Sequence, residues 1–394
     1  MKERASVLVT DGNERAALAI VRSLGRVGYR VVVGSARRNS LAGASRFAAA
    51  DVQVPDAITS PDAFLEAMRA VIDRFRVSIL LPVSEPSLLA ILPAHFPDVC
   101  IPMPSDESFR RISDKAEVLR AAASVGLPIP MQRIAHSSDE ARATADELEY
   151  PVVLKPSRSI GESSGQRRKQ GVQHVASQAE FLSAVGALDH AAFPLLIQRR
   201  IVGPGVGVFL LVWDGETRAV FCHRRIREKP PSGGVSVYRE SIAPNAALVE
   251  RSRSLLDRFD WRGVAMVEYK VDAVTGQPFV MEVNGRFWGS LQLAIDAGVD
   301  FPALLIAAAR HEDVPRTEPY AVGARSRWWW GDVDHLIARF RSADDDSFNG
   351  QMPSRRRALI EFLQWRLGFE REEVFRVDDP RPFLRETRQW FSRP

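Results

Sequence analysis

Two glutamates and an asparagine lie on neighbouring segments whose residue pattern predicts a pair of strands. Glu268 belongs to the first segment, and Glu282 and Asn284 belong to the second. Apolar and polar residues alternate in both, as they do in half-buried strands. The linking stretch 272–278 contains Gly and Pro, so a hairpin centred near Thr275 would place Glu268 directly opposite Glu282. Like charges that face each other destabilise a sheet, so a compensating partner is expected.

Mg²⁺ fits these side chains, because it prefers hard oxygen ligands and usually completes its shell with water and substrate phosphates. Arg286 follows two residues after Asn284 and is well placed to contact a phosphate oxygen. The alternation also predicts that Met281 and Val283 point to the apolar side, away from Glu282. A simpler interpretation is a solvated polar sheet face on which Lys270 offsets one charge, and these two segments leave it open.

Length and composition indicate a soluble protein of two or three domains. The chain has 394 residues, of which 45% are hydrophobic and 26% are charged. A net charge of +4 is too small to argue for nucleic acid, and it suits an anionic substrate equally well. The two cysteines match no metal or redox spacing, and neither a signal-peptide core nor a membrane-spanning apolar run is found. We therefore expect a cytoplasmic protein without a transmembrane segment.

The N-terminal region alternates strands and helices. Strands are predicted at 7–12, 28–34 and 79–82, with an amphipathic helix at 14–24, which together indicate an open parallel α/β domain. The first turn lacks the G-x-G-x-x-G pattern of dinucleotide-binding proteins. Ligands of such sheets lie beyond the carboxyl ends of the strands, where Asp11, Gly12, Ser84 and Glu85 are candidates. The alternative is that these four residues form turns and helix caps.

The middle of the chain carries further basic and glycine-rich signals. A helix is predicted from Lys115, and a buried strand at 150–156 ends on Lys155 and a proline. The stretch 157–171 reads as a flexible loop rich in Gly, Ser, Arg and Lys. Another strand ends at Gln198 before a glycine-rich turn, and Asp214-Gly215 is predicted to join two more strands.

Taken in order, these motifs resemble the ATP-grasp superfamily, on the branch similar to carbamoyl phosphate synthetase-like enzymes and carboxylate–amine ligases. The resemblance runs from about residue 113 to 302. It implies an α/β and α+β fold: a pre-grasp α/β domain (1–112), a two-lobed ATP-grasp domain (113–310, with lobes 113–200 and 201–310) and a C-terminal helical extension (311–394). The implied cofactors are ATP and Mg²⁺, with Mn²⁺ as an alternative.

The resemblance also implies roles for individual residues. Glu268, Glu282 and Asn284 would carry the metal, and Arg286 would hold the γ-phosphate or an acyl phosphate. The residues that would contact ATP are Lys115, Lys155, Ser159, Gly161, Ser163, Ser164, Gly165, Gln198, Arg199, Arg200 and Ile201. Related families often have a glutamate at the Gln198 position and an acidic residue soon after it for the ribose. Here residues 203–208 are mainly Gly and Val and include no acidic residue, which puts the ribose contact in doubt.

The basic segment 223–230 offers Arg225 as a candidate for holding the acceptor carboxylate or the transferred phosphate. The alternative is a solvated basic strand and loop. Residues 161–165 also fit the G-x-S-x-G nucleophile elbow, but Ser163 lies in a polar loop with no helix predicted after it. Three tryptophans, Trp328 to Trp330, would point to both faces of a strand and are expected to pack in the interior or at an interface.

The sequence therefore predicts a ligase that activates a carboxylate as an acyl phosphate for an amine or a thiol. Its partners would be small-molecule carboxylate and amine substrates, with no nucleic acid, and the resemblance leaves a homodimer open. Two rivals are a regulatory ATP-binding module without turnover and a nicotinamide-dependent reductase on the N-terminal domain. The missing glycine fingerprint speaks against the reductase.

Overall fold

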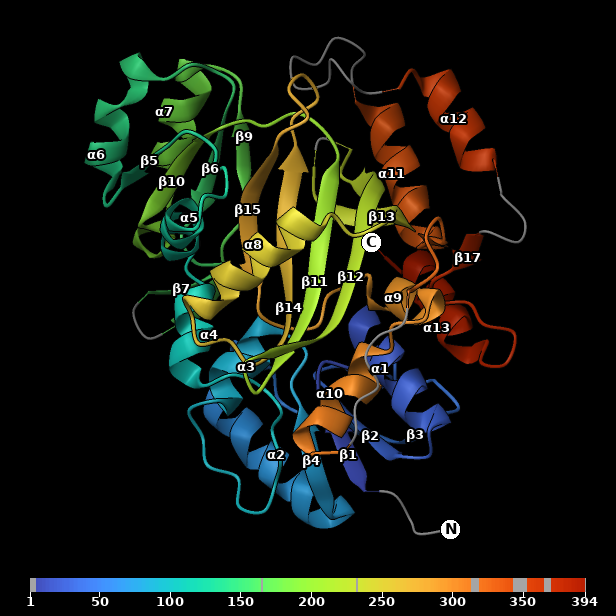
Figure 1. The fold of residues 1–394 in the computed structure, drawn as a ribbon. Coiled ribbons are helices and arrows are strands. Elements are labelled where there is room, and N and C mark those ends of the chain that lie inside the picture. Colours follow the sequence, from blue (N-terminus) through green and yellow to red (C-terminus); the bar gives the residue numbers. More distant parts are fainter. Residues whose placement is uncertain are drawn as a thin grey trace.

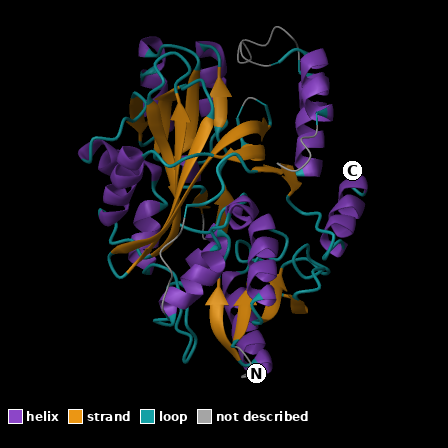
Figure 2. Cartoon of the chain, turned by 45° about the vertical axis from the view of Figure 1, so that its right-hand side comes forward, coloured by secondary structure: helices purple, strands orange, loops and turns teal. Residues whose placement is uncertain are grey.

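The computed structural model describes residues 5–163, 166–231, 233–312, 319–342, 353–364 and 370–393. Its strands form three sheets and one separate hairpin. Figure 1 places the sheet of the N-terminal region at the bottom of the molecule and the two other sheets above it. Figure 2 shows the same two groups of strands with helices packed around them. Within the described residues no single helix is long and apolar enough to span a membrane.

The N-terminal sheet is parallel and open, as the sequence predicts. Its strand order is β3-β2-β1-β4, with bounds β1 Ser6–Val9, β2 Arg30–Ser35, β3 Ala48–Gln53 and β4 Val77–Leu81. The helices of this region are α1 Arg15–Arg26, α2 Pro61–Phe75, α3 Glu85–Ile91 and α4 Asp106–Ile112. Val7, Leu8 and Val9 are fully buried, because β1 lies between two strands and has helices on both faces.

The second sheet has the order β5-β10-β6-β9 and is antiparallel. Its strands are β5 Gln132–Ala135, β6 Val152–Pro156, β9 Gln173–Val175 and β10 Leu195–Arg199. The nearby helices are α5 Lys115–Ser124, α6 Ser138–Ala143 and α7 Gln178–Gly186, with two short 3₁₀ turns at Ala145–Glu147 and His190–Ala192. The prediction of a flexible loop at 157–171 is wrong for most of this stretch. β7 Ile160–Ser163 pairs with β8 Gln166–Lys169 as a hairpin.

The third sheet has seven strands in the order β15-β14-β11-β12-β13-β16-β17. Their bounds are β11 Gly205–Trp213, β12 Glu216–Lys229, β13 Val235–Ser241, β14 Gly263–Val271, β15 Pro278–Asn284, β16 Arg325–Arg327 and β17 Glu370–Glu372. The turn between β11 and β12 is formed by Asp214 and Gly215 as predicted. Both residues have positive φ, the conformation that a tight hairpin turn requires. The accompanying helices are α8 Ala246–Asp257, α9 Leu291–Ala297 and α10 Phe301–Ala309.

The C-terminal region is not purely helical, which corrects the expectation of a helical extension. Its helices are α11 Trp329–Arg341, α12 Arg355–Leu363 and α13 Arg381–Phe391. Two short strands of the same region, β16 and β17, extend the seven-stranded sheet beyond β13. Each is three residues long, too short to give an alternation pattern that can be read from sequence. The division into domains remains a prediction.

The three tryptophans do not lie on a strand. Trp328 precedes α11, and the two that follow open that helix. Each ring packs on a different partner: Arg15 covers Trp328, Trp329 contacts Phe362, and Trp330 stacks on Trp390. The run thus joins separate segments of the chain, in line with the packing role expected for it.

Residues 370–393, here called the C-terminal clasp, bind the N-terminal region through buried ion pairs. Arg22 on α1 donates to Asp379 at 2.9 Å, and both side chains are at most 1% exposed. Arg22 also donates to the backbone carbonyl oxygens of Val374 and Asp379. On the surface, Arg26 pairs with Asp378. Figure 1 shows the clasp, in red, beside the blue N-terminal region.

Candidate active site

The hairpin of β14 and β15 has the predicted register. Glu268 is the direct partner of Glu282, so the two carboxylates stand opposite each other on one face of the sheet. Asn284 lies two residues further along β15, and its amide donates to Glu282 Oε1 at 3.1 Å. Burial raises the pKa of Glu268. Burial also favours the neutral form of Glu282, but Lys115 and Lys155 outweigh it and hold the pKa of Glu282 below its ordinary value.

The position of Met281 differs from the prediction. The register shifts between Glu268 and Tyr269, so that Tyr269 pairs with Val280 and Met281 is the extra residue of a β-bulge. Val280 therefore takes the fully buried apolar position, and Met281 turns into the cleft beside Glu282. Strict alternation placed Met281 on the apolar side, which was wrong because a bulge inserts one residue and changes the face.

Two lysines from the second sheet region approach the carboxylates. Lys115, the first residue of α5, donates to Ser159 Oγ at 2.9 Å and lies 3.8 Å from Glu282 Oε2. Lys155 on β6 is 3.9 Å from the sulfur of Met281. Burial lowers the pKa of Lys155, while Glu282 and Glu268 oppose this shift. Buried lysines are rare, so this arrangement favours a bound anion.

The α5 end of this site is held by capping contacts. Asp114, the N-cap of α5, accepts from the backbone N–H of Ala116 and Glu117 and from Ser157 Oγ. The backbone N–H of Lys115 donates to the Ser157 carbonyl oxygen at 2.8 Å. Lys115 is thereby fixed to the segment that follows Lys155, and the two lysines are positioned together.

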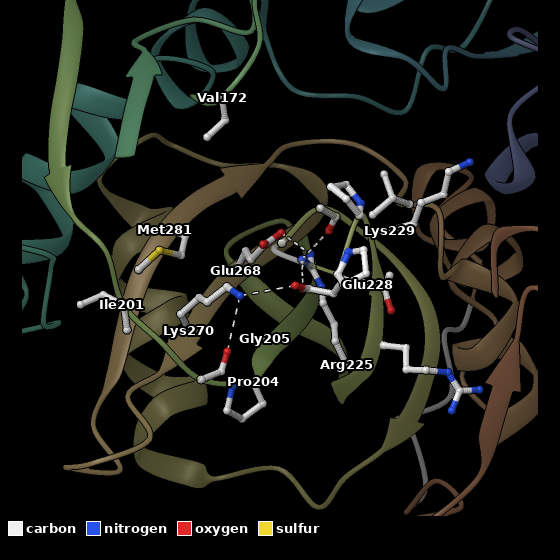
Figure 3. Close-up of a pocket in the computed structure, with 18 of the residues that line it drawn as sticks. Val172, Ile201, Pro204, Gly205, Arg225, Glu228, Lys229, Glu268, Lys270 and Met281 are labelled. Atoms are coloured by element: carbon white, nitrogen blue, oxygen red, sulfur yellow. Dashed lines mark hydrogen bonds and ion pairs between the residues drawn. The ribbon is translucent and has the colours of Figure 1, made fainter. Parts of the chain in front are cut away.

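A network of ion pairs surrounds Glu268, as Figure 3 shows. Arg225 on β12 donates to Glu268 at 2.5 Å and to Glu228 at 2.9 Å. Lys270 lies 3.4 Å from the other oxygen of Glu228 and also donates to the Gly203 carbonyl oxygen. Arg225 was predicted to hold a substrate or the transferred phosphate. Here it is bound by two carboxylates of the protein, so it positions Glu268 and Glu228.

The remaining cations of the basic segment are also paired. Arg224 is bound by Glu240, Arg227 by Asp332 with two hydrogen bonds, and Lys229 by Asp334. Asp332 and Asp334 come from α11, about a hundred residues further along the chain. The arginines and the lysine of the basic segment are thus all paired with carboxylates of the protein.

Arg286 forms no ion pair with a carboxylate among the described residues, and in this it resembles Lys155. Its guanidinium donates to Asn284 Oδ1 and to the Phe287 carbonyl oxygen, both at 3.1 Å. Glu85, the first residue of α3, lines the same small cavity as Arg286, Lys115 and Ser159. Burial raises the pKa of Glu85, and Arg286 and Lys115 oppose that rise.

The other N-terminal candidates have structural roles. Asp11 accepts from the backbone N–H of Ser84 and from the hydroxyls of Ser84 and Ser87, and Ser84 caps α3. These two residues therefore fit the alternative of turns and caps. Gly12 packs tightly against Val33 and Ser40. Only Glu85 reaches the site.

One cleft of about 1100 Å³ connects most of these residues. Ten of the predicted site residues line it: Lys155, Gln198, Arg199, Arg200, Ile201, Arg225, Glu268, Glu282, Asn284 and Arg286. Lys115 and Ser159 line the adjoining cavity of about 20 Å³. Gly161 lines neither cavity, and a Cβ there would lie 2.4 Å from the Ala191 carbonyl oxygen. Ser164 and Gly165 lie outside the described residues, as does the side chain of Ser163.

The nucleophile-elbow pattern at Ser163 has no matching structure. An elbow turns from a strand into a helix. Ser163 instead ends β7, which leads into β8. The backbone therefore supports the rejection of Ser163 as a hydrolase nucleophile.

The far end of the cleft has a wall of apolar side chains. Val153, Ile201 and Met281 line it and are each less than 9% exposed, and Val172 lines it from beside β9. Gln198 is buried and donates to Gln132 Oε1 at 2.8 Å. Figure 3 shows Val172, Ile201 and Met281 on the same side of the cleft. An apolar wall with a few polar groups is typical of a pocket for a flat organic ring.

The donor set fits a metal that is shared with a substrate. Among the described residues there is no group of three or more His, Cys, Asp or Glu side chains that could enclose a metal ion. Glu268, Glu282 and Asn284 instead offer two carboxylates and one amide oxygen on one open sheet face. Mg²⁺ binds in this manner when phosphate oxygens and water supply its other ligands.

Comparisons with known proteins give a family match and sequence relatives. A family model described as "ATP-grasp in the biosynthetic pathway with Ter operon" matches residues 192–329. The carbamoyl phosphate synthase large chain of Pseudothermotoga lettingae is 23% identical over 320 residues, which cover 75% of this chain and 28% of the relative. That of Halomonas eurihalina is 28% identical over 198 residues, covering 48% and 18%. This chain thus spans about a quarter of the length of such relatives, or less.

Solved structures share the fold at low sequence identity. Biotin carboxylase from Campylobacter jejuni has a TM-score of 0.63 at 18% identity and covers 81% of this chain and 74% of its own. L-amino acid ligase from Bacillus licheniformis has a TM-score of 0.61 at 19% identity, with coverages of 81% and 78%. N5-carboxyaminoimidazole synthetase from Staphylococcus aureus in complex with ADP has a TM-score of 0.61 at 14% identity, covering 82% of both chains.

Proposed function

Because this chain resembles the ATP-grasp superfamily in its family-model match, its sequence relatives and its fold, we propose that it is an ATP- and Mg²⁺-dependent ligase. The proposed reaction activates a carboxylate as an acyl phosphate, which an amine or a thiol then attacks. The observation that carries the proposal is the pair of facing carboxylates, Glu268 and Glu282, with Lys115, Lys155 and Arg286 around them in one cleft.

The chemistry follows from these charges. A carboxylate oxygen attacks the γ-phosphorus, the bond from phosphorus to the ADP oxygen breaks, and an acyl phosphate forms. The amine then attacks the acyl carbon, phosphate leaves, and the amine loses a proton. Lys115, Lys155 and Arg286 would hold the phosphate oxygens, where charge-assisted hydrogen bonds are strongest. Positioning supplies most of the acceleration, because neither step needs a nucleophile from the protein.

Mg²⁺ would be held by Glu268, Glu282 and Asn284, and when bound it neutralises charge on the phosphate oxygens. Arg225 contributes by keeping Glu268 oriented. Because Lys115 lies 3.8 Å from Glu282, a phosphate group bound by a metal on Glu282 would be within reach of this lysine.

The nucleotide base would lie against the apolar wall of Val153, Val172, Ile201 and Met281. For the ribose, the acidic residue expected near positions 203–208 is missing, and Glu228 on β12 offers a carboxylate instead. A Cβ on Gly205 would lie 3.2 Å from Glu228 Oε1, so the glycine leaves room for that carboxylate. We place the ribose hydroxyls next to Glu228.

The second substrate is expected on the opposite side of Arg286. Glu85 presents a carboxyl group there with no ion-pair partner within 4.0 Å among the described residues. A substrate ammonium group would supply that partner, and its proton would pass to Glu85 before the free amine attacks. This favours an amine over a thiol as the nucleophile, and Glu85→Gln should then raise the KM for the amine more than the KM for ATP.

An isotope experiment tests the proposed reaction. A carboxylate labelled with ¹⁸O in both oxygens transfers one of them to phosphate if an acyl phosphate forms, so the released phosphate should carry one ¹⁸O per turnover. Phosphate without the label would refute the acyl-phosphate route. A regulatory module would bind ATP and release no ADP with any pair of acid and amine.

A further inference from the structure

A second cavity, of about 510 Å³, lies between the N-terminal region and the C-terminal clasp. Its lining comes from the segment 43–48 and from α13, and it shares no lining residue with the cleft. Four of the nine lining residues are arginines, Arg46, Arg381, Arg385 and Arg388, and none is Asp or Glu. We call this cavity the arginine pocket.

The guanidinium groups of the arginine pocket lack carboxylate partners among the described residues. Arg46 and Arg385 donate to backbone carbonyl oxygens, those of Asp378 and Arg38, both at 3.3 Å. Arg385 Nε is buried and donates to none of the described residues. Arg381 and Arg388 form no ion pair with a described residue. This sets the pocket apart from the cleft, where most arginines are bound by acids.

Three carboxylates beside the arginine pocket are already hydrogen-bonded, among them Asp51, which accepts from the backbone N–H and the hydroxyl of Ser40. Asp379 accepts from Arg22, from Ser45 Oγ at 2.7 Å and from the backbone N–H of Arg46 at 2.9 Å. Asp378 pairs with Arg26 at 2.9 Å. Asp378 and Asp379 thus connect the two walls of the pocket, and neither forms an ion pair with its four arginines among the described residues.

The end of α13 adds to this charge. Arg381 is the first residue of this eleven-residue helix, and its N-cap is Pro380, whose side chain caps no backbone N–H group. The N-terminus of a helix carries a partial positive charge. Arg381, which lines the pocket, lies at this positive end of α13.

We propose that the arginine pocket binds a small organic anion with two or more phosphate charges. Arg is suited to phosphate because its planar group donates two parallel hydrogen bonds. Four arginines around one cavity carry more positive charge than a single monovalent anion would neutralise. A small molecule is favoured over a nucleic acid or an acidic protein, because the positive charge lines a concave space within the usual volume range of ligand pockets, about 300–1000 Å³.

Inorganic pyrophosphate is the probe for this proposal. It is titrated into the full chain without divalent metal, and binding is followed by calorimetry at low and at physiological ionic strength. The double variant Arg385→Ala/Arg388→Ala should bind about tenfold more weakly or worse, because it removes two charge-assisted contacts. Arg120→Ala, which removes an exposed arginine on α5, should bind like wild type.

Pyrophosphate also suits the lysines of the cleft, so Lys155→Ala serves as a second comparison. Binding that persists in Lys155→Ala and weakens in the double variant supports the arginine pocket. Absence of binding to wild type overturns the proposal, as does binding that the double variant leaves unchanged. If the double variant does not fold, Arg388→Glu replaces it, because Arg388 is exposed and reversal of its charge should weaken binding in the same direction.

Discussion

At the scale of single residues, the site combines a few cations with carboxylates that hold them in place. Glu268 and Glu282 face each other, and the cost of that arrangement is offset by Arg225 on one side and Lys115 on the other. Met281 enters the cleft only because β15 carries a bulge, and bulges often aim a side chain into a functional site.

Lys155 offers a prediction at this scale. Its side chain is half-buried at the cleft, with no carboxylate within 4.0 Å of its ammonium group among the described residues, so it should favour a bound phosphate. Lys155→Gln should weaken ATP binding by about 10- to 100-fold, the effect of losing one charged hydrogen bond of roughly 1.5–3 kcal/mol. The dissociation constant for ATP, measured by calorimetry, checks this. An unchanged constant in a folded variant would show that Lys155 does not contact the nucleotide.

At the scale of elements, the connection from β10 to β11 forms one side of the cleft and depends on Gly203. This residue has φ +152°, and a Cβ on it would lie 1.8 Å from the Val271 carbonyl oxygen. The close approach allows the connection to pair with the end of β14 through Val271 and Ala273.

Gly203→Ala should therefore lower both stability and nucleotide affinity. Backbone strain of this kind costs about 1–3 kcal/mol, and displacement of β14 adds to it. Thermal unfolding and ATP titration measure the two effects. Gly171→Ala is the matched control, since a Cβ there meets nothing within 4 Å and φ is not positive. Equal melting temperatures for both variants would contradict the account.

The hairpin, most strands of the cleft and the parallel N-terminal sheet could be predicted from sequence, because alternation and turn residues are local signals. The bulge at Met281 could not, since it changes the face of one residue without altering composition. The ion pairs of Arg227 and Lys229 could not be predicted from sequence either, because their partners Asp332 and Asp334 lie about a hundred residues further along the chain. Glu85 was one of four candidates at the strand ends. Only the folded structure shows that it, unlike the other three, lines a cavity of the site.

At the scale of the whole molecule, the C-terminal clasp joins the N-terminal region to the seven-stranded sheet. Arg15 on α1 and Arg239 on β13 both bind Glu373 of the clasp. Trp328 donates to Glu386, and Arg15, which covers the Trp328 ring, also lines the cleft. One wall of the cleft therefore depends on contacts among three parts of the chain.

Two arginines of α1 test how strongly the clasp is held. Arg22→Ala should destabilise the protein by about 3–5 kcal/mol, because it leaves the Asp379 charge buried without its ion-pair partner. Arg26→Ala removes an exposed pair and should cost about 0–1 kcal/mol. Denaturant unfolding of both variants gives the comparison. Equal losses of stability would mean that burial does not set the strength of these pairs.

The clasp should also respond to pH through Glu386. Burial raises the pKa of this carboxyl group from 4.5 to about 7. A folded state that holds its proton more tightly is favoured at low pH, so this contribution to stability is present below pH 4.5 and is lost as pH rises to about 7. Its full size is about 3 kcal/mol at most.

Glu386→Gln should remove that dependence and keep an acceptor for Trp328 Nε1. The difference in melting temperature between variant and wild type should therefore grow in favour of the variant from pH 5 to pH 8. A difference that stays constant over this range would show that Glu386 titrates normally in the folded protein.

The most direct test of the central claim is ADP formation by wild type and by Glu282→Ala, measured across a panel of carboxylates and amines with ATP and Mg²⁺. The account predicts that one pair of substrates stimulates ADP release by wild type, and that Glu282→Ala loses this stimulation by a factor of about a hundred or more while it remains folded. Equal ADP release by the two proteins would contradict the assignment of Glu282 to the metal and phosphate site.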